Sequence, residues 1–202
     1  MPPLTSARLL RDPIRQFAVW FKAADRSRAV TYPTVMCLST VDRRGWPEGR
    51  FVLLKDFDER GFVFYGNIRS AKGKALLASP TAALTLYWEG LKRQVRIQGR
   101  TELVSDDEAD AYFRTRSRAS QLAAWASPQS APIPTRAILE RRVAVMQRRF
   151  RGRPVPRPPF WVGFRVAPER LELWQERPNR LHDRFLYTKR AQRGWRIVRL
   201  AP

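Results

Sequence analysis

Short runs in which apolar and polar residues alternate recur along most of the chain. Such alternation predicts half-buried β-strands, because neighbouring side chains of a strand point to opposite faces. Two turns, at residues 42–45 and 58–61, end in a glycine and are typical of hairpins. The predicted strands cover residues 34–41, 50–56, 61–66, 82–88, 93–104, 161–166, 170–175, 184–188 and 195–200.

Helical patterns lie between these strands. Asp12 followed by Pro13 is a typical helix start, and Ile14, Phe17 and Phe21 then share one apolar face. Because strands and helices do not alternate, we expect a mainly β fold with α, a β-barrel decorated by helices, in one domain over residues 1–202. The other predicted helices cover residues 70–78, 109–116 behind a capping box of Ser105 and Glu108, and 135–150; a proline-rich connector follows at 151–159.

Composition narrows the class of protein. Hydrophobic residues make up 44% of the 202 residues, which is enough to bury a sizeable core. The one cysteine, Cys37, lies in an apolar run and excludes an intramolecular disulfide. No apolar run approaches the roughly 18 residues that cross a bilayer, and Arg8, Arg11 and Asp12 interrupt the apolar segment that a signal peptide needs. We therefore expect a cytoplasmic protein with no membrane partner.

The formal charge of +21 favours anionic partners such as nucleic acid, an anionic membrane or phosphorylated small molecules. The basic residues are scattered, and their densest cluster lies at residues 141–153, on one predicted helix and its exit. No ribonucleoprotein motif, zinc-finger spacing or basic-zipper pattern is present. A solvated basic face is the simplest interpretation, and charge alone leaves nucleic-acid binding as an alternative.

Several enzyme classes are excluded by missing motifs. One histidine and one cysteine cannot build a zinc site of the usual kind. The spacing from Gly66 to Gly73 and Lys74 does not fit a P-loop, and Ala75 replaces the hydroxyl residue that would hold magnesium. No dinucleotide-binding glycine motif follows a strand, and no nucleophile-elbow motif occurs. The sequence therefore argues against ATPases, zinc hydrolases and NAD-dependent dehydrogenases.

One candidate site is a phosphate-binding helix face. Tyr112, Arg116 and Ser120 are four residues apart, so on a continuous helix they share one face. A phenol, a guanidinium and a hydroxyl together suit a phosphate dianion. A surface tyrosine–arginine pair beside an unrelated serine is the alternative.

Two further candidates are considered as strand segments. In a strand, Arg180, His182 and Arg184 would point to one face and form a cationic patch around the one histidine, although a basic edge that discourages aggregation fits as well. Arg50 and Lys55 would point to opposite faces of a regular strand and need not touch the same ligand group. An ordinary amphipathic strand with charged ends is the alternative there.

Taken in order, these segments resemble the pyridoxine/pyridoxamine 5′-phosphate oxidase family over nearly the whole chain. Arg180-Leu181-His182-Asp183-Arg184 is the strongest single signature. The resemblance implies a split β-barrel, a homodimer with FMN at the subunit interface, and a C-terminal dimerisation and active-site segment at about 160–202. The other matching segments are residues 50–55, 93–95, 112–113 with 116 and 120–121, 129–130, 160–164 and 174–175.

The resemblance also implies roles for individual residues. Lys55, Tyr112, Arg116 and Ser120 would hold the substrate phosphate, and the catalytic residues Arg180 and His182 would lie against its pyridine ring. The residues that would contact FMN are Arg50, Phe51, Val52, Leu53, Leu54, Lys55, Tyr65, Gly66, Lys72, Gln94, Gln129, Ser130, Trp174 and Arg184.

The implied reaction oxidises pyridoxamine or pyridoxine 5′-phosphate to pyridoxal 5′-phosphate, with O2 as the acceptor and hydrogen peroxide as the second product. Two alternatives remain: a related flavin oxidase that acts on another ring, as in phenazine biosynthesis, and a non-enzymatic binder of pyridoxal phosphate or nucleic acid. Lys55 and Arg116 argue against the first, because a substrate without phosphate would not need them.

The chain departs from the family pattern at three places. Ala71 stands where an arginine is common, so one guanidinium expected near the FMN phosphate is missing unless Arg69 substitutes for it. Val162 stands where glycine is usual. Upstream of the first helix only Arg8 and Arg11 are available to cover the site. We therefore expect weaker retention of FMN and a less enclosed site.

Overall fold

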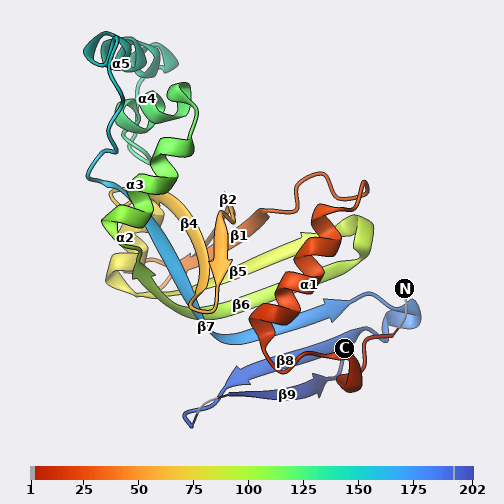
Figure 1. The fold of residues 1–202 in the computed structure, drawn as a ribbon. Coiled ribbons are helices and arrows are strands. Elements are labelled where there is room, and N and C mark those ends of the chain that lie inside the picture. The colour runs from red at the N-terminus through yellow and green to blue at the C-terminus, as the bar shows by residue number, and fades with distance from the viewer. Residues whose placement is uncertain (1–2, 193) are drawn as a thin grey trace.

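The computed structural model describes residues 3–192 and 194–202, and its strands join into one curved sheet (Figure 1). The strands are β1 (Val35–Val41), β2 (Pro47–Leu53), β3 (Asp56–Asp58), β4 (Gly61–Asn67), β5 (Thr81–Trp88), β6 (Arg93–Leu103), β7 (Trp161–Gln175), β8 (Asp183–Lys189) and β9 (Trp195–Leu200). The helices are α1 (Pro13–Asp25), α2 (Ala71–Ala78), α3 (Asp106–Thr115), α4 (Arg118–Ala126) and α5 (Arg136–Arg149), with short 3-10 turns at Ser6–Arg8, Glu89–Leu91 and Pro178–Arg180.

The sheet has the order β2-β1-β5-β6-β7-β4-β3, and β8 and β9 continue it from the far half of β7. Residues 161–166 and 170–175, predicted as two strands, form the single strand β7. A shift of register opposite Gln98 and Gly99 bends β7, so that its first half pairs with β4 and its second half with β8. A Cβ on Gly99 would lie 1.9 Å from the carbonyl oxygen of Ala167, so only glycine fits there. The prediction of a mainly β split barrel decorated by helices is confirmed.

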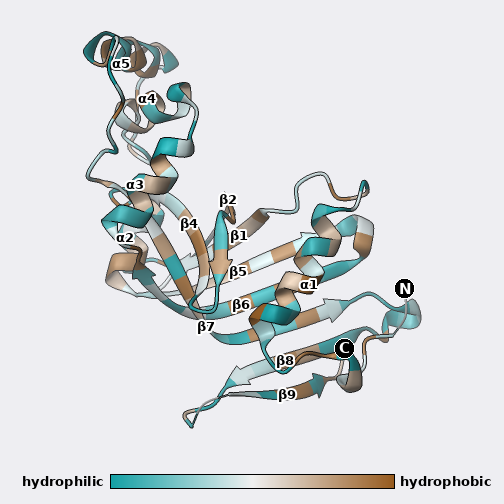
Figure 2. Ribbon diagram, viewed as in Figure 1, coloured by the Kyte–Doolittle hydropathy of each residue, from teal (hydrophilic) through white to brown (hydrophobic). Residues whose placement is uncertain are grey.

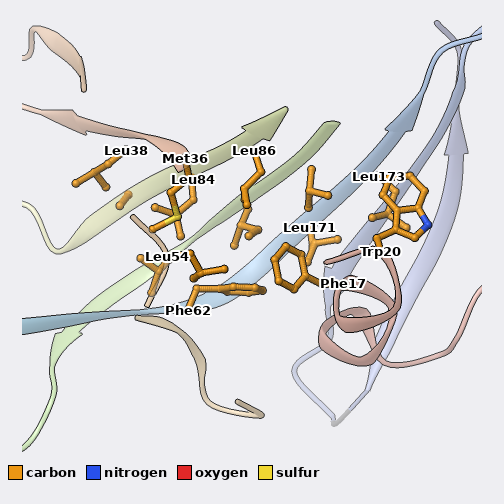
Figure 3. Packing of buried hydrophobic residues seen from close by; sticks show 14 of the residues in the cluster. Phe17, Trp20, Met36, Leu38, Leu54, Phe62, Leu84, Leu86, Leu171 and Leu173 are labelled. Carbon is orange, nitrogen blue, oxygen red and sulfur yellow. The ribbon is translucent and has the colours of Figure 1, made fainter. Parts of the chain in front are cut away.

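The main core lies between the concave face of the sheet and α1. Asp12 caps α1 as predicted, because its carboxylate accepts hydrogen bonds from the backbone N–H groups of Ile14 and Arg15. Figure 3 shows Phe17 and Trp20 of this helix pointing at leucines of the sheet. Apolar burial of this kind is worth about 1.5–3 kcal/mol for each large side chain. The core therefore fixes the curved sheet on which the candidate residues lie.

Helices α3, α4 and α5 lie beyond the N-terminal end of β7, where Trp161 is (Figure 1). A second, smaller core lies there. That core contains Phe113, Leu122, Phe150 and Trp161. Helix α5 buries none of its residues, and Figure 2 shows apolar and polar residues interspersed along it. In the ranges 3–192 and 194–202, no helix is long and apolar enough to span a membrane.

Three predictions about local structure were wrong. Tyr112, Arg116 and Ser120 do not share one helix, because α3 ends at Thr115 and Ser117 caps a new helix, α4. Arg180 and His182 precede β8 rather than lie in it, since Arg180 closes a 3-10 turn. The predicted strand over 50–56 ends at Leu53, and Lys55 lies in the connection to β3.

Candidate functional site

The predicted site residues form two groups at opposite ends of β7. The helical-end group consists of Arg50, Lys55, Lys72, Tyr112, Arg116 and Gln129, near Trp161 at the start of β7. The C-terminal group consists of Gln94, Trp174, Arg180, His182 and Arg184, at the end of β7. A strand rises about 3.3 Å per residue, so Trp161 and Trp174 are roughly 40 Å apart along β7.

Lys72 is the centre of the first cationic cluster in the helical-end group. It lies in the first turn of α2, and Ser70, the N-cap of that helix, is fully buried. The Lys72 ammonium donates hydrogen bonds to Gln129 Oε1 at 2.6 Å and to Ser70 Oγ at 3.3 Å. A Cβ on Gly66 would lie 2.8 Å from Lys72 Cε, so glycine at this position leaves room for the lysine stem.

The surroundings of Lys72 disfavour the charged form of its side chain. Burial lowers the pKa of Lys72, and the positive charge of Arg50 lowers it further. Arg50 pairs with Glu48 and donates to Thr40 Oγ1 at 2.6 Å. Lys72 itself has only neutral hydrogen-bond acceptors among the residues described. A buried lysine beside an arginine and a helix N-terminus is a donor set that fits a phosphate monoester, as FMN would supply.

Arg116 is the centre of the second cationic cluster in the helical-end group. Its guanidinium lies over the ring of Trp161, with its central carbon 4.8 Å from the ring centroid. Its Nη1 atom is buried and has no hydrogen-bond partner within the described part of the chain. Burial lowers the pKa of Arg116. A buried donor without an acceptor costs about 1–3 kcal/mol, and an anionic ligand would remove that cost.

Three nearly parallel aromatic rings lie beside Arg116. The ring centroid of Tyr65, from β4, is 4.2 Å from that of Tyr112 and 5.0 Å from that of Trp161, and the last two are 6.1 Å apart. Burial raises the pKa of Tyr65 to about 12, with the negative charge of Glu108 adding to the effect. The phenol of Tyr65 therefore stays neutral at physiological pH. The Lys55 ammonium lies over the ring of Tyr112, 5.9 Å from its centroid.

The remaining predicted contacts at the helical end are placed as follows. Ser120 follows the helix break and accepts a hydrogen bond from Ser117 Oγ at 2.9 Å. Ser130 adopts a positive φ of 69° beside Gln129, in an exposed turn. Phe51, Val52, Leu53 and Leu54 follow Arg50, and their side chains alternate between exposed and more buried.

In the C-terminal group, three predicted residues form a row across adjacent strands. Gln94 of β6 pairs with Trp174 of β7, which pairs with Arg184 of β8. Their sequence neighbours Val95, Leu173 and Phe185 are buried in the core, so the row faces away from it. Arg184 is held there by Glu172, its Nε lying 2.8 Å from a carboxylate oxygen.

His182 lies beside this row. Its ring centroid is 4.7 Å from that of Trp174, and its Nδ1 accepts a hydrogen bond from the backbone N–H of Arg177 at 3.1 Å. Arg180, at the end of the preceding turn, has a positive φ of 61° and an exposed side chain. An open pocket of about 400 Å³ is lined by Leu181, His182, Arg199 and Leu200.

The outward face also presents unusually exposed apolar side chains. Phe51 is 79% exposed and Tyr87 is 53% exposed. Tyr87 pairs with Gln94, and Phe51 reaches the same face through the pairs Phe51–Cys37 and Cys37–Thr85. Exposed apolar surface of this kind is typical of a protein interface.

The sequence analysis assigned no role to some residues that contact the two groups. Trp161 supports Arg116, and Glu172 anchors both Arg184 and Arg96. Trp161 lies in the matching segment 160–164, but a sequence match does not reveal which ring a guanidinium contacts. Arg69, considered as a substitute for the missing arginine, lies over the ring of Phe160 at 4.8 Å.

Comparisons with known proteins show what this chain is similar to. The chain is 56% identical over 191 residues to the pyridoxine/pyridoxamine 5′-phosphate oxidase of Rubrobacter xylanophilus, covering 95% of this chain and 87% of that one. It is 53% identical to pyridoxine/pyridoxamine 5′-phosphate oxidase 1 of Ralstonia nicotianae, with 95% and 89% covered. The crystal structure of PhzG from Burkholderia lata in complex with tetrahydrophenazine-1-carboxylic acid matches with a TM-score of 0.92 at 28% identity, covering 99% and 98% of the two chains.

Two family models match the chain, one before and one after the connector at residues 151–160. Residues 24–150 match the model described as pyridoxamine 5′-phosphate oxidase, and this range contains the whole helical-end group and also Gln94 of the C-terminal group. Residues 161–202 match the pyridoxine 5′-phosphate oxidase C-terminal dimerisation region, which contains Trp174, Arg180, His182 and Arg184. With both regions matched in order, the chain belongs to the pyridoxamine 5′-phosphate oxidase family.

Proposed function

We propose that this protein is an FMN-dependent oxidase that converts pyridoxamine 5′-phosphate or pyridoxine 5′-phosphate into pyridoxal 5′-phosphate. O2 is the electron acceptor and hydrogen peroxide the second product. The amine substrate also takes up water and releases ammonia when its imine hydrolyses. Relatives that carry this activity in their names match the chain almost from end to end.

The observation that supports this proposal best is the presence of two clusters of cationic side chains at one end of the sheet. Lys72 and Arg50 form one, and Arg116 with Lys55 forms the other. A phosphorylated cofactor and a phosphorylated substrate require two such clusters. A cofactor alone would leave the buried Nη1 of Arg116 without an acceptor.

In this proposal Lys72, Arg50 and the N-terminus of α2 hold the FMN phosphate. Bound FMN supplies the redox chemistry, since its ring system accepts a hydride equivalent and passes electrons to O2. The protein contributes binding and orientation. Arg116, Lys55, Tyr112 and Ser120 hold the substrate phosphate, which fixes one end of the substrate and leaves its reacting carbon to be placed by the ring contacts.

Arg180 and His182 are proposed to contact the substrate ring. Because Nδ1 of His182 accepts a hydrogen bond from a backbone N–H group, the neutral imidazole has its proton on Nε2. In that form Nε2 donates a hydrogen bond and cannot take up a proton. We therefore assign His182 to substrate orientation and not to general-base catalysis.

A homodimer is part of the proposal. The two groups lie near opposite ends of β7, and we do not expect one copy to bring both to the same ligand. A second copy that covers the outward face around Phe51 and Tyr87 would bring its C-terminal group to the first copy's helical end. Each copy would then supply half of each of two equivalent sites.

The test is an aerobic assay of purified protein with added FMN and pyridoxamine 5′-phosphate, following pyridoxal 5′-phosphate by its absorbance and peroxide in parallel. We expect equal amounts of both products, and much weaker activity with unphosphorylated pyridoxamine. Bound FMN without product would favour a related flavin oxidase acting on another ring, as the likeness to PhzG allows. Absence of both product and bound FMN would overturn the proposal.

A further inference from the structure

Arg116 is oriented by a ring contact and not by a hydrogen bond or an ion pair. Its side chain has no carboxylate partner among the described residues, and its buried Nη1 has no acceptor there. The residue lies at the break between α3 and α4, where its backbone is extended and its N–H donates to Phe113 O at 3.2 Å. The contacts of the guanidinium are the rings of Trp161 at 4.8 Å and Phe113 at 5.5 Å.

Trp161 is itself held rigidly. Its ring is nearly parallel to those of Tyr65 and Tyr112, with interplanar angles of 6° and 8°, and the edge of Phe113 packs against it. The side chain is 7% exposed. Its carbonyl oxygen accepts a hydrogen bond from Arg157 Nη1 at 2.8 Å.

Arg157 also links Trp161 to α3, the helix that precedes Arg116. Its guanidinium pairs with Asp106 and Asp110 of α3, at 2.6 Å and 2.5 Å. Trp161 and α3 therefore keep a fixed relative position. Changes at the indole face should therefore act on Arg116 through the contact between the two side chains.

A planar guanidinium on an aromatic face keeps its N–H groups at the edge, in the plane of the fork that binds phosphate oxygens. An ammonium group cannot be oriented in this way, because it is a point charge on a flexible stem. The flat indole face and the planar guanidinium should therefore act together on an anion.

We propose that Trp161 is a positioning residue that presents Arg116 to the substrate phosphate and so sets the preference for phosphorylated over unphosphorylated rings. This inference rests on the proposed function. It adds a residue and a specificity role to the same site.

The first test compares Trp161→Leu, which removes the flat face, with Trp161→Phe, which keeps one. We expect Trp161→Leu to raise KM for pyridoxamine 5′-phosphate about tenfold, since a desolvated cation–π contact is worth about that much, with kcat and KM for unphosphorylated pyridoxamine nearly unchanged. Trp161→Phe should recover most of the loss. The matched control is Trp125→Leu, since Arg149 lies over Trp125 in the same way outside the site.

The second test is a double-mutant cycle with Arg116→Lys. If Trp161 acts through the guanidinium, Trp161→Leu has no further effect on KM once Arg116 is lysine. Independent, multiplying effects of the two substitutions would overturn the inference. So would a wild-type KM in Arg116→Lys, a comparison that leaves Trp161 in place and does not depend on Trp161→Leu folding.

A third measurement does not depend on catalysis. Equilibrium dialysis of pyridoxal 5′-phosphate against the FMN-free protein should show about tenfold weaker binding for Trp161→Leu than for the wild type and for Trp125→Leu. Equal binding by all three proteins would overturn the inference. A wild type that binds this ligand but turns over no substrate would contradict the proposed function while leaving the positioning role supported.

Discussion

Two sets of cationic side chains, one near each end of β7, differ in their partners. At the helical end, Lys55, Lys72 and Arg116 have no carboxylate partner among the described residues. At the other end, each of four arginines pairs with an acid: Arg96 and Arg184 with Glu172, Arg177 and Arg199 with Asp183. Cations without counter-ions indicate where anionic ligands bind, whereas paired cations hold the structure together.

The largest expected effect is a loss of stability on substitution of Asp183, at the C-terminal end of β7. Burial alone would raise the pKa of Asp183, but hydrogen bonds from Arg177, Arg199 and the backbone N–H of Leu4 hold it below its ordinary value. Asp183→Asn should lower the free energy of unfolding by about 3 kcal/mol at neutral pH.

The pH dependence of this effect follows from the lowered pKa. A carboxylate whose pKa is lowered on folding stabilises the protein above the unfolded value of 3.8, and that contribution is lost as pH falls through the folded value. Urea unfolding should thus show a constant difference between wild type and variant above pH 3.8, closing only at lower pH. Glu169→Gln, which breaks an exposed pair with Arg100, is the control and should change little. A small effect of Asp183→Asn at neutral pH would contradict the claim that the paired cations hold the structure together.

Lys72→Met tests the unpaired end. It should weaken FMN binding about 10- to 100-fold, because a charge-assisted hydrogen bond is worth about 1.5–3 kcal/mol, as titration of the flavin fluorescence would measure. Lys74→Met, an exposed lysine of the same helix, should leave the affinity unchanged.

Unlike FMN binding, the stability of the FMN-free protein should not fall in Lys72→Met. The pKa of Lys72 is lowered by folding, so the unfolded chain binds more protons between the folded value and 10.5, and stability of the FMN-free protein rises with pH there. Removing the lysine should abolish that rise and should not destabilise the FMN-free protein. A marked loss of stability would mean that Lys72 is a structural residue.

Ala71→Arg would add a cation to the unpaired end. Ala71 is the exposed first residue of α2, beside the proposed FMN phosphate. We expect up to tenfold tighter FMN binding in the same fluorescence titration, and no gain from Ala78→Arg at the other end of the helix. Unchanged affinity would indicate that the common arginine is not needed in this chain.

His182→Asn should have the smallest effect. General-base catalysis contributes about 10²–10⁴-fold, whereas loss of an orienting hydrogen bond costs about tenfold or less. We expect kcat to fall by no more than about tenfold, with an unchanged shape of its pH profile. A larger loss that depends on pH would restore the proton-transfer role.

Much of the fold could be predicted because it depends on local pattern. Alternation placed the strands, and the Asp12–Pro13 signal placed the start of α1. The helix break was missed because Arg116 and Ser117 are both tolerated inside helices, although Ser117 is also a good N-cap. The turn before His182 had a signal in Pro178-Asn179, where Asn179 adopts a positive φ of 57°.

The division of the candidate site could not be predicted in the same way. Alternation assigns residues such as Gln94 and Trp174 to a face of a strand, but not to an end of the folded sheet. That position depends on the pairing of β6, β7 and β8 and on the bend opposite Gly99, which are long-range features. The resemblance named the residues of one site, and only the structure separated them into two groups.

The continuity of β7 also has a genetic consequence. In the proposed two-fold dimer, a substitution at the helical end and one at the C-terminal end of β7 would damage different halves of each site. A dimer that pairs a Lys72→Met copy with an Arg180→Met copy would hold one site with both defects and one with neither. Two inactive alleles expressed together should therefore restore part of the activity, with at most one working site in each mixed dimer.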